Sequence, residues 1–128
     1  MVAARYAYLL LAWAFVVGVI IQVFLIGLGL FADSGAVKLH IDFGYILHLF
    51  PLLIVTAAAV ARAGRRRILQ AVALAAIVFV VPLLPSLSGS APIVAALHPV
   101  LAMLAFGAAV GVAIAATRFT QAGPAVVG

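Results

Sequence analysis

Four long apolar runs, separated by short polar segments, set the pattern of this chain. The runs cover residues 6–31, 40–61, 68–84 and 93–117. A transmembrane helix needs about 20 apolar residues at 1.5 Å each, with roughly 17–25 as the usual range. The pattern therefore predicts four membrane-spanning helices joined by short turns, and a loose tail over residues 119–128.

The short connections favour an antiparallel arrangement, in which helices that follow one another in sequence pack side by side. We therefore expect an all-α membrane protein, a single domain over residues 1–128 with four transmembrane helices in an up-down-up-down bundle. The second and fourth helices lie diagonally in such a bundle. Their axes would be about 12–14 Å apart if adjacent axes are about 8–10 Å apart.

The composition excludes several classes of protein. Hydrophobic residues make up 70% of the chain and charged residues only 7%, whereas soluble domains carry roughly 25% charged residues. Cysteine is absent and the only acidic residues are Asp33 and Asp42, so disulfides and thiol chemistry are ruled out. No nucleophile–base pair or metal-activated water can be assembled, and we expect an electron carrier rather than a catalyst.

The basic residues lie at the ends of the apolar runs. If the helices alternate, Arg5, Arg118 and the four arginines within residues 62–67 fall on one side of the membrane, and only Lys38 on the other. By the positive-inside rule, this distribution predicts a multi-pass protein of the bacterial plasma membrane with both termini cytoplasmic. Because these charges lie between apolar runs and form no continuous basic surface, we expect no nucleic acid as a partner. We expect membrane lipid instead.

Three histidines are the ionisable side chains inside the spans, where such groups are costly and default to a functional role. His98 precedes Arg118 by 20 residues and His40 precedes Arg62 by 22, about 30 Å and 33 Å along a helix. These two histidines should lie at similar depth near the outer edge of the membrane. His48 should lie about two turns deeper.

Small residues share the helix faces of two of these histidines. Gly44 lies one turn after His40, and Ala102 one turn after His98, which leaves room for a flat group between the helices. Neutral imidazole suits iron, and two filled axial positions favour electron transfer. We expect haem held by His40 and His98. His48 is an alternative ligand, a hydrogen-bonding support or part of a quinone pocket. The same sequence pattern is also typical of histidines at the membrane interface and of ordinary helix packing through alanines.

Two short motifs resemble known sequences. Residues 40–45 (HIDFGY) resemble a His-x-x-x-Gly-Tyr start of a second helix, and residues 96–102 (ALHPVLA) resemble a Leu-His-Pro start of a fourth helix. With the basic turn between the second and third helices, they resemble a group of small uncharacterised bacterial four-helix membrane proteins. They are also similar to one half of haem A synthase and to four-helix b-type cytochromes.

The resemblance implies haem b bound between His40 and His98, with Tyr45 beside the outer pocket. Ile41 stands where such motifs often carry an arginine for a haem propionate, so Lys38 is the expected substitute. The chain has no Glu, and therefore lacks the glutamate that haem A synthase uses near its second-helix histidine. This difference argues against the oxidation chemistry of the synthase.

A second hypothesis rests on the rear face of the fourth helix. Gly107 and Gly111 form a Gly-x-x-x-Gly pair, a spacing that lets another helix approach closely. It predicts a non-catalytic accessory subunit of a larger membrane complex, or a homo-oligomer formed through this face. A quinone is a further candidate partner.

Overall fold

The computed structural model describes residues 2–122, and within that range all regular structure is helical. The elements are α1 (Val2–Phe31), α2 (Ala36–Leu47), α3 (Phe50–Val60), α4 (Arg65–Val80), η1 (Val81–Leu83), η2 (Pro85–Leu87), α5 (Pro92–Ala95) and α6 (His98–Gln121). They form four segments that are long and apolar enough to cross a membrane: Val2–Phe31, Ala36–Val60, Arg65–Leu87 and Pro92–Gln121. The predicted all-α class with four spans is confirmed.

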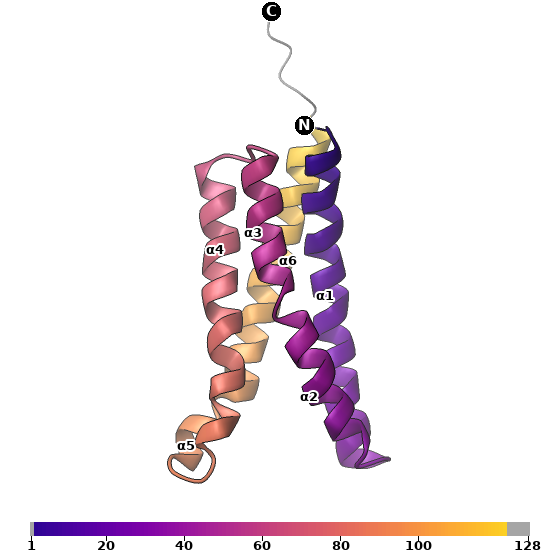
Figure 1. Ribbon diagram of the computed structural model, residues 1–128, viewed down its shortest axis with the longest axis vertical. Helices are drawn as coiled ribbons and strands as arrows, with labels where there is room; N and C mark the ends of the chain where they lie inside the picture. Colours follow the sequence, from indigo (N-terminus) through magenta and orange to yellow (C-terminus); the bar gives the residue numbers. More distant parts are fainter. Residues whose placement is uncertain (1, 123–128) are drawn as a thin grey trace, which may run out of the picture.

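The two ends of the bundle carry different segments (Figure 1). The start of α1, the turn between α3 and α4 and the end of α6 lie together at one end, which we call the arginine end. The turn after α1 and the short helix α5 lie at the other, which we call the far end. Helix α1 packs against α2, α3 and α6, and α4 packs against α3 and α6.

The second span is interrupted at its middle, where the sequence pattern predicted one continuous helix. His48 and Leu49 separate α2 from α3. Proline has no backbone N–H, so Pro51 cannot donate to the carbonyl of Leu47 four residues before it. At the break, the N–H of Leu49 bonds to the carbonyl of Ile46, three residues before it, at 3.2 Å. The break therefore follows from one missing donor.

The helix ends also differ from the predicted bounds. Helix α1 begins at Val2 instead of residue 6, and the second span begins at Ala36 instead of residue 40. Helix α4 starts at Arg65, and its span ends in the two short 3-10 turns around Pro82 and Pro85. These differences extend the helices into polar segments, because a helix can continue past the membrane edge where water solvates its side chains.

The predicted tail is partly helical. Helix α6 runs to Gln121, and Phe119 is buried against the bundle. This packing carries the helix past Arg118, the residue at which the apolar run stops. Residues 123–128 lie outside the described part of the chain.

The tightly packed core lies in the half of the bundle nearer the arginine end. The largest fully buried side chains are Tyr8, Phe15, Ile54, Leu74 and Pro51. Buried alanines line the facing helices and let their backbones approach closely: Ala12, Ala58, Ala71, Ala113 and Ala116. In α1 the buried residues stop at Gly18, and in α6 they begin at Ala105. Towards the far end, α2 diverges from α4 and α6 (Figure 1).

Helix α2 packs closely on α1 at a glycine of α1. A Cβ atom added to Gly29 would lie 2.6 Å from Val37 Cγ2 and 3.0 Å from the backbone nitrogen of Val37. Because one of these atoms belongs to the backbone, it cannot move aside cheaply. Gly29 is therefore needed for the close approach of α2, whereas Gly27, one half-turn away, has nothing within 4 Å of an added Cβ.

We expect Gly29→Ala to destabilise the folded protein by about 1–3 kcal/mol, the usual cost of overpacking. The matched control Gly27→Ala should be neutral or stabilising by up to about 1 kcal/mol, because alanine is the better helix former. Thermal unfolding of the detergent-purified protein, followed by circular dichroism, measures both. Equal stability of the two variants would show that α2 does not sit on α1 as described.

Candidate functional site

The three histidines share one hydrogen-bonding arrangement. All lie half-buried in the half of the bundle nearer the far end. Each Nδ1 contacts a backbone carbonyl oxygen: His40 with Gln22 at 3.0 Å, His48 with Gly44 at 2.6 Å, and His98 with Val81 at 2.8 Å. A carbonyl only accepts, so each Nδ1 carries the proton and donates. In the neutral ring, Nε2 then keeps its lone pair.

A proline explains the position of His98. The carbonyl of Val81 would normally accept from the N–H four residues later, but that residue is Pro85, which has none. The Nδ1–H of His98 donates to this carbonyl. Pro99 follows immediately, as one of the first residues of α6, and fixes His98 at the start of that helix.

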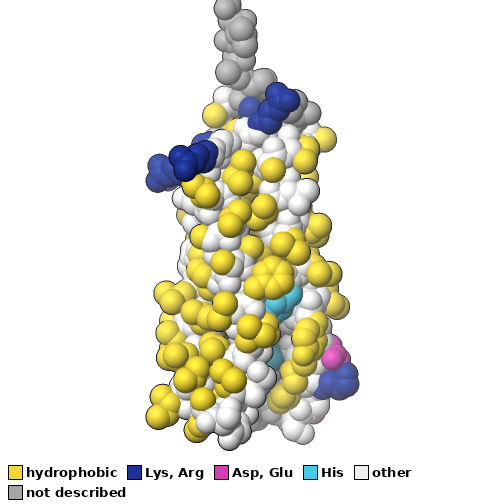
Figure 2. Space-filling view, turned by 60° about the vertical axis from the view of Figure 1, so that its left-hand side comes forward, with side chains coloured by type: hydrophobic (Ala, Val, Ile, Leu, Met, Phe, Trp, Pro, Cys, Tyr) yellow, Lys and Arg dark blue, Asp and Glu magenta, His cyan; other side chains and the backbone are white. Residues whose placement is uncertain are grey.

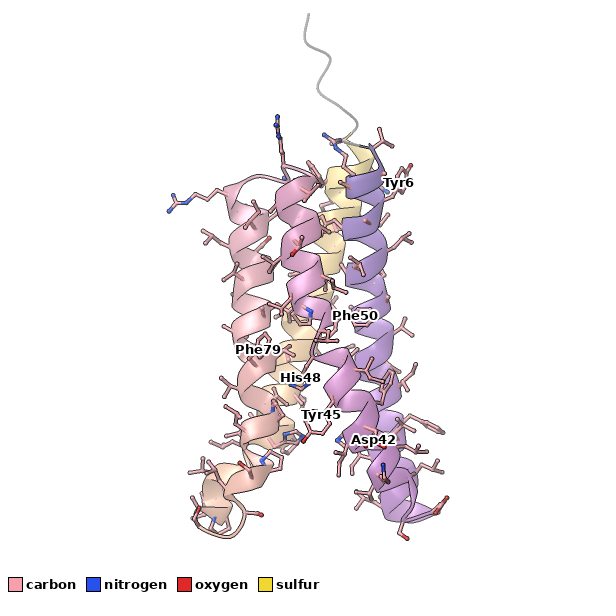
Figure 3. The ribbon with its side chains drawn as sticks, viewed as in Figure 1. Tyr6, Asp42, Tyr45, His48, Phe50 and Phe79 are labelled. Carbon is pink, nitrogen blue, oxygen red and sulfur yellow. The ribbon has the colours of Figure 1, made fainter. Side chains whose placement is uncertain are left out.

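His48 lies at the break in the second span. The carbonyl oxygen of Gly44 accepts two hydrogen bonds from His48, one from its backbone N–H at 3.1 Å and one from its Nδ1–H. The ring meets Phe79 of α4 edge-on, with 6.2 Å between centroids (Figure 3). Its Nε2 is buried and has no hydrogen-bond partner. A buried polar atom without a partner is unusual and marks a candidate ligand position.

His40 is turned towards the first span instead. Its Nδ1 donates to the backbone of Gln22, and the side chain of Gln22 lies directly over Gly44. A Cβ added to Gly44 would lie 2.7 Å from Gln22 Nε2. Gln22 Oε1 is a second buried acceptor without a partner. The small size of Gly44 thus makes room for an amide of α1.

Both His48 and His98 contact the third span. His48 contacts Phe79 and His98 contacts Val81, and these residues are separated by about 3 Å of helix rise. Counting residues from the arginines paired His40 with His98 by depth, and that pairing stays a prediction. The structure sets His48 and His98 against the third span and His40 against the first.

Lys38 and Tyr45 lie on the surface. Lys38 forms an ion pair with Asp42, one turn further along α2, and both side chains are exposed. Its ammonium group is therefore engaged at the surface of α2. Tyr45 is 68% exposed, and Figure 3 shows it on the side of α2 from which α4 diverges.

The small residues on the His98 face of α6 differ in burial along the helix. Ala102 is half-buried, but Ala105 and Ala109, further along the same face, are buried in the core. At the level of Ala105 and Ala109, the helices pack closely and leave no room for a flat group. Nearer the far end, Figure 2 shows histidine side chains in a furrow between apolar side chains. Within residues 2–122, no group of three His or acidic side chains could hold a bare metal ion.

Sequence reasoning missed two contributors to the histidine site. The carbonyl of Val81 could have been found, because Pro85 stands four residues after it and leaves it without a helical donor. Phe79 carried no signal, because an apolar residue in an apolar span looks like any other. Gln22 was visible as a polar residue in the membrane, but its contact with Gly44 needed the fold.

Four apolar helices with three imidazoles inside the spans define a multi-pass helical membrane protein. The chain belongs to a family of unknown function, DUF6220, whose family model matches residues 22–88. The matched stretch contains Gln22, His40, His48 and the arginine turn, and it ends before His98. No curated protein and no solved structure matches the chain.

We expect the neutral ring of each histidine to carry its proton on Nδ1, because each Nδ1 faces a carbonyl oxygen. The ¹⁵N chemical shifts of ring-labelled protein in detergent distinguish the two tautomers. Single His→Gln variants assign each signal. A proton on Nε2 of any one histidine would remove that residue as a candidate ligand.

Proposed function

We propose that this chain binds haem b through histidines of its second and fourth spans and transfers electrons within the bacterial plasma membrane. The observation that carries the proposal is the shared anchoring of the three rings, with Nδ1 on a carbonyl and Nε2 left available. Metal-ligating histidines almost always donate their other ring N–H in this way, which fixes the tautomer and the ring orientation. The motifs around His40 and His98 support the same cofactor.

The donor set would fit haem iron, which binds neutral imidazole nitrogens. We assign His98 as the ligand from the fourth span and His48 as the ligand from the second. His48 has the buried Nε2 without a partner and, like His98, contacts the third span. His40 is the alternative, and in this assignment it ties α2 to α1.

The protein would contribute orientation and exclusion of water. The carbonyls of Gly44 and Val81 hold the two rings by Nδ1, so that each Nε2 is presented in one direction. Phe79 packs on the edge of His48 and covers it with apolar surface. The cofactor, when bound, supplies a one-electron redox couple.

The charge distribution supports the orientation in this proposal. Six of the seven basic residues lie at the arginine end, and only Lys38 lies towards the far end. The positive-inside rule then puts the arginine end in the cytoplasm and the histidines nearer the outer face. Electrons would pass between a membrane donor, such as a quinol, and an acceptor at that face.

The reduced-minus-oxidised absorbance spectrum of the detergent-purified, haem-loaded protein tests the proposal. We expect sharp α and Soret bands that are lost in His98→Ala and in His48→Ala. Each of these variants should also retain haem at least about tenfold less well, at the lower end of the effects of metal-site substitutions. The bands should persist in His40→Ala.

Tyr45→Phe is the matched control, because Tyr45 is exposed on the same helix and should leave the spectrum unchanged. Loss of the bands in His40→Ala with retention in His48→Ala would move the second-span ligand to His40. A featureless spectrum of the unsubstituted protein after haem loading would refute the proposal.

A second candidate function, as an accessory subunit of a larger membrane complex or a homo-oligomer, is favoured by the surface of α6. Gly107 and Gly111 are both exposed, and an added Cβ at either position meets nothing within 4 Å. The packing face of this Gly-x-x-x-Gly pair is therefore not used inside the bundle. Another transmembrane helix could pack closely there.

We expect Gly107→Leu to lower the association of this protein with itself or with a co-purifying subunit by at least about tenfold, since a bulky side chain prevents close helix contact. Light scattering and cross-linking in mild detergent measure self-association, and pull-down from membranes measures the subunit. Thermal stability of the monomer should not fall, because the position is open. Unchanged association would show that this face is not the contact.

A further inference from the structure

A pocket lies between α4 and α6 at the arginine end, away from the histidines. It has a volume of about 260 Å³ and is lined by Arg66, Arg67, Gln70, Gly111, Ala115 and Arg118. Three guanidinium groups and one amide therefore surround one concave site. None of these residues belongs to the haem proposal.

Within residues 2–122, no carboxylate side chain lies at the arginine end to neutralise these cations. The only side-chain carboxylates of the chain are those of Asp33 and Asp42, and both lie towards the far end of the molecule (Figure 2). Guanidinium groups remain charged at every physiological pH. An anion bound between them would relieve their mutual repulsion beside the low-dielectric interior of the membrane.

One of the three guanidinium groups is already held in place. Arg67 Nη1 donates to the carbonyl of Ala63 at 2.9 Å, and its guanidinium carbon lies 5.0 Å from the centre of the Phe119 ring. Arg5 lies over the same ring at 4.3 Å. A fixed guanidinium loses less conformational entropy when it binds an anion.

The residues of α6 that line the pocket are one arginine and two small residues. Gly111 and Arg118 lie seven residues apart on α6, about 10 Å along the helix. Gly111 and Ala115 are small, and an added Cβ on Gly111 meets nothing within 4 Å. The pocket thus extends from the charged membrane edge into the apolar span, over a surface that bulky side chains would fill.

We propose that this pocket binds the phosphate group of an anionic phospholipid, with Arg66, Arg67 and Arg118 around the phosphate and the lipid chains over Gly111 and Ala115. Arginine binds phosphate with paired, charge-assisted hydrogen bonds. Basic pockets between transmembrane helices are suited to lipid headgroups. A free phosphate ion shares the charged half of this chemistry but not the apolar half, so the two sources can be separated by experiment. The proposal does not depend on haem binding.

Native mass spectrometry of the delipidated full chain, titrated with phosphatidylglycerol or phosphatidylcholine, tests the site. We expect one tightly bound phosphatidylglycerol and at least tenfold weaker binding of phosphatidylcholine. The double variant Arg66→Gln/Arg118→Gln should bind phosphatidylglycerol at least about tenfold more weakly, at about a factor of five per arginine near a membrane surface. The control Arg62→Gln/Arg65→Gln removes the same charge from the same turn but outside the pocket, and should keep the affinity.

A second pair of variants tests the shape without changing the charge. Gly111→Leu fills the apolar end and should weaken phosphatidylglycerol binding at least tenfold. Gly107→Leu, one turn away and outside the pocket lining, should not. This pair keeps the proposal testable even where the arginine variants fail to fold.

Inorganic phosphate separates the two sources. If 10 mM phosphate neither displaces phosphatidylglycerol nor raises the thermal stability of the lipid-free protein, the lipid is the ligand. If it does both, with the same dependence on Arg66 and Arg118, the site is a phosphate site supplied from solution, and the lipid part of the proposal is overturned. Equal loss of affinity in the pocket and control doubles, or equal affinity for the two lipids, would overturn the site itself.

Discussion

The missing N–H of Pro51 is the constraint on which the arrangement of this bundle depends. In hydrocarbon every backbone polar group needs a partner within the protein, and Pro51 removes one at the middle of the second span. The span breaks at His48, and its two halves take different directions. Helix α3 joins the packed core with α4, whereas α2 stays on α1 and leaves α4 and α6. The break therefore separates a dense half from an open one.

The same rule bears on the positions of His48 and His98. Prolines at 51 and 85 leave the carbonyls of Leu47 and Val81 without helical donors. His98 satisfies the second of these, and His48 lies within the break caused by the first. Imidazole is a donor at one nitrogen and an acceptor at the other. Each ring that donates to a backbone carbonyl with Nδ1 consequently presents an acceptor, Nε2, to its surroundings.

The apolar pattern was enough to predict the class, the four spans and their turns, because long apolar runs have few alternatives in a membrane. The break at His48 was not predicted, although Pro51 is visible, because proline is tolerated in many transmembrane helices where neighbours supply the lost bond. Counting residues gives the depth of each histidine along its own helix, but it does not show that His48 and His98 contact the third span and His40 the first. The contact of His48 with Phe79 depends on packing that no local pattern records.

The uneven packing also bears on where a prosthetic group could be accommodated. Core residues such as Tyr8, Phe15 and Leu74 concentrate close packing towards the arginine end, where inserting a bulky group would disrupt well-packed side chains at a cost of several kcal/mol, to judge from overpacked cores. Near the far end, α2 packs chiefly on α1, and the buried acceptors Nε2 of His48 and Oε1 of Gln22 are without partners. A group that entered there would displace lipid and little protein, and it would satisfy groups that the fold leaves unpaired. The open half is thus where binding costs the bundle least and relieves it most.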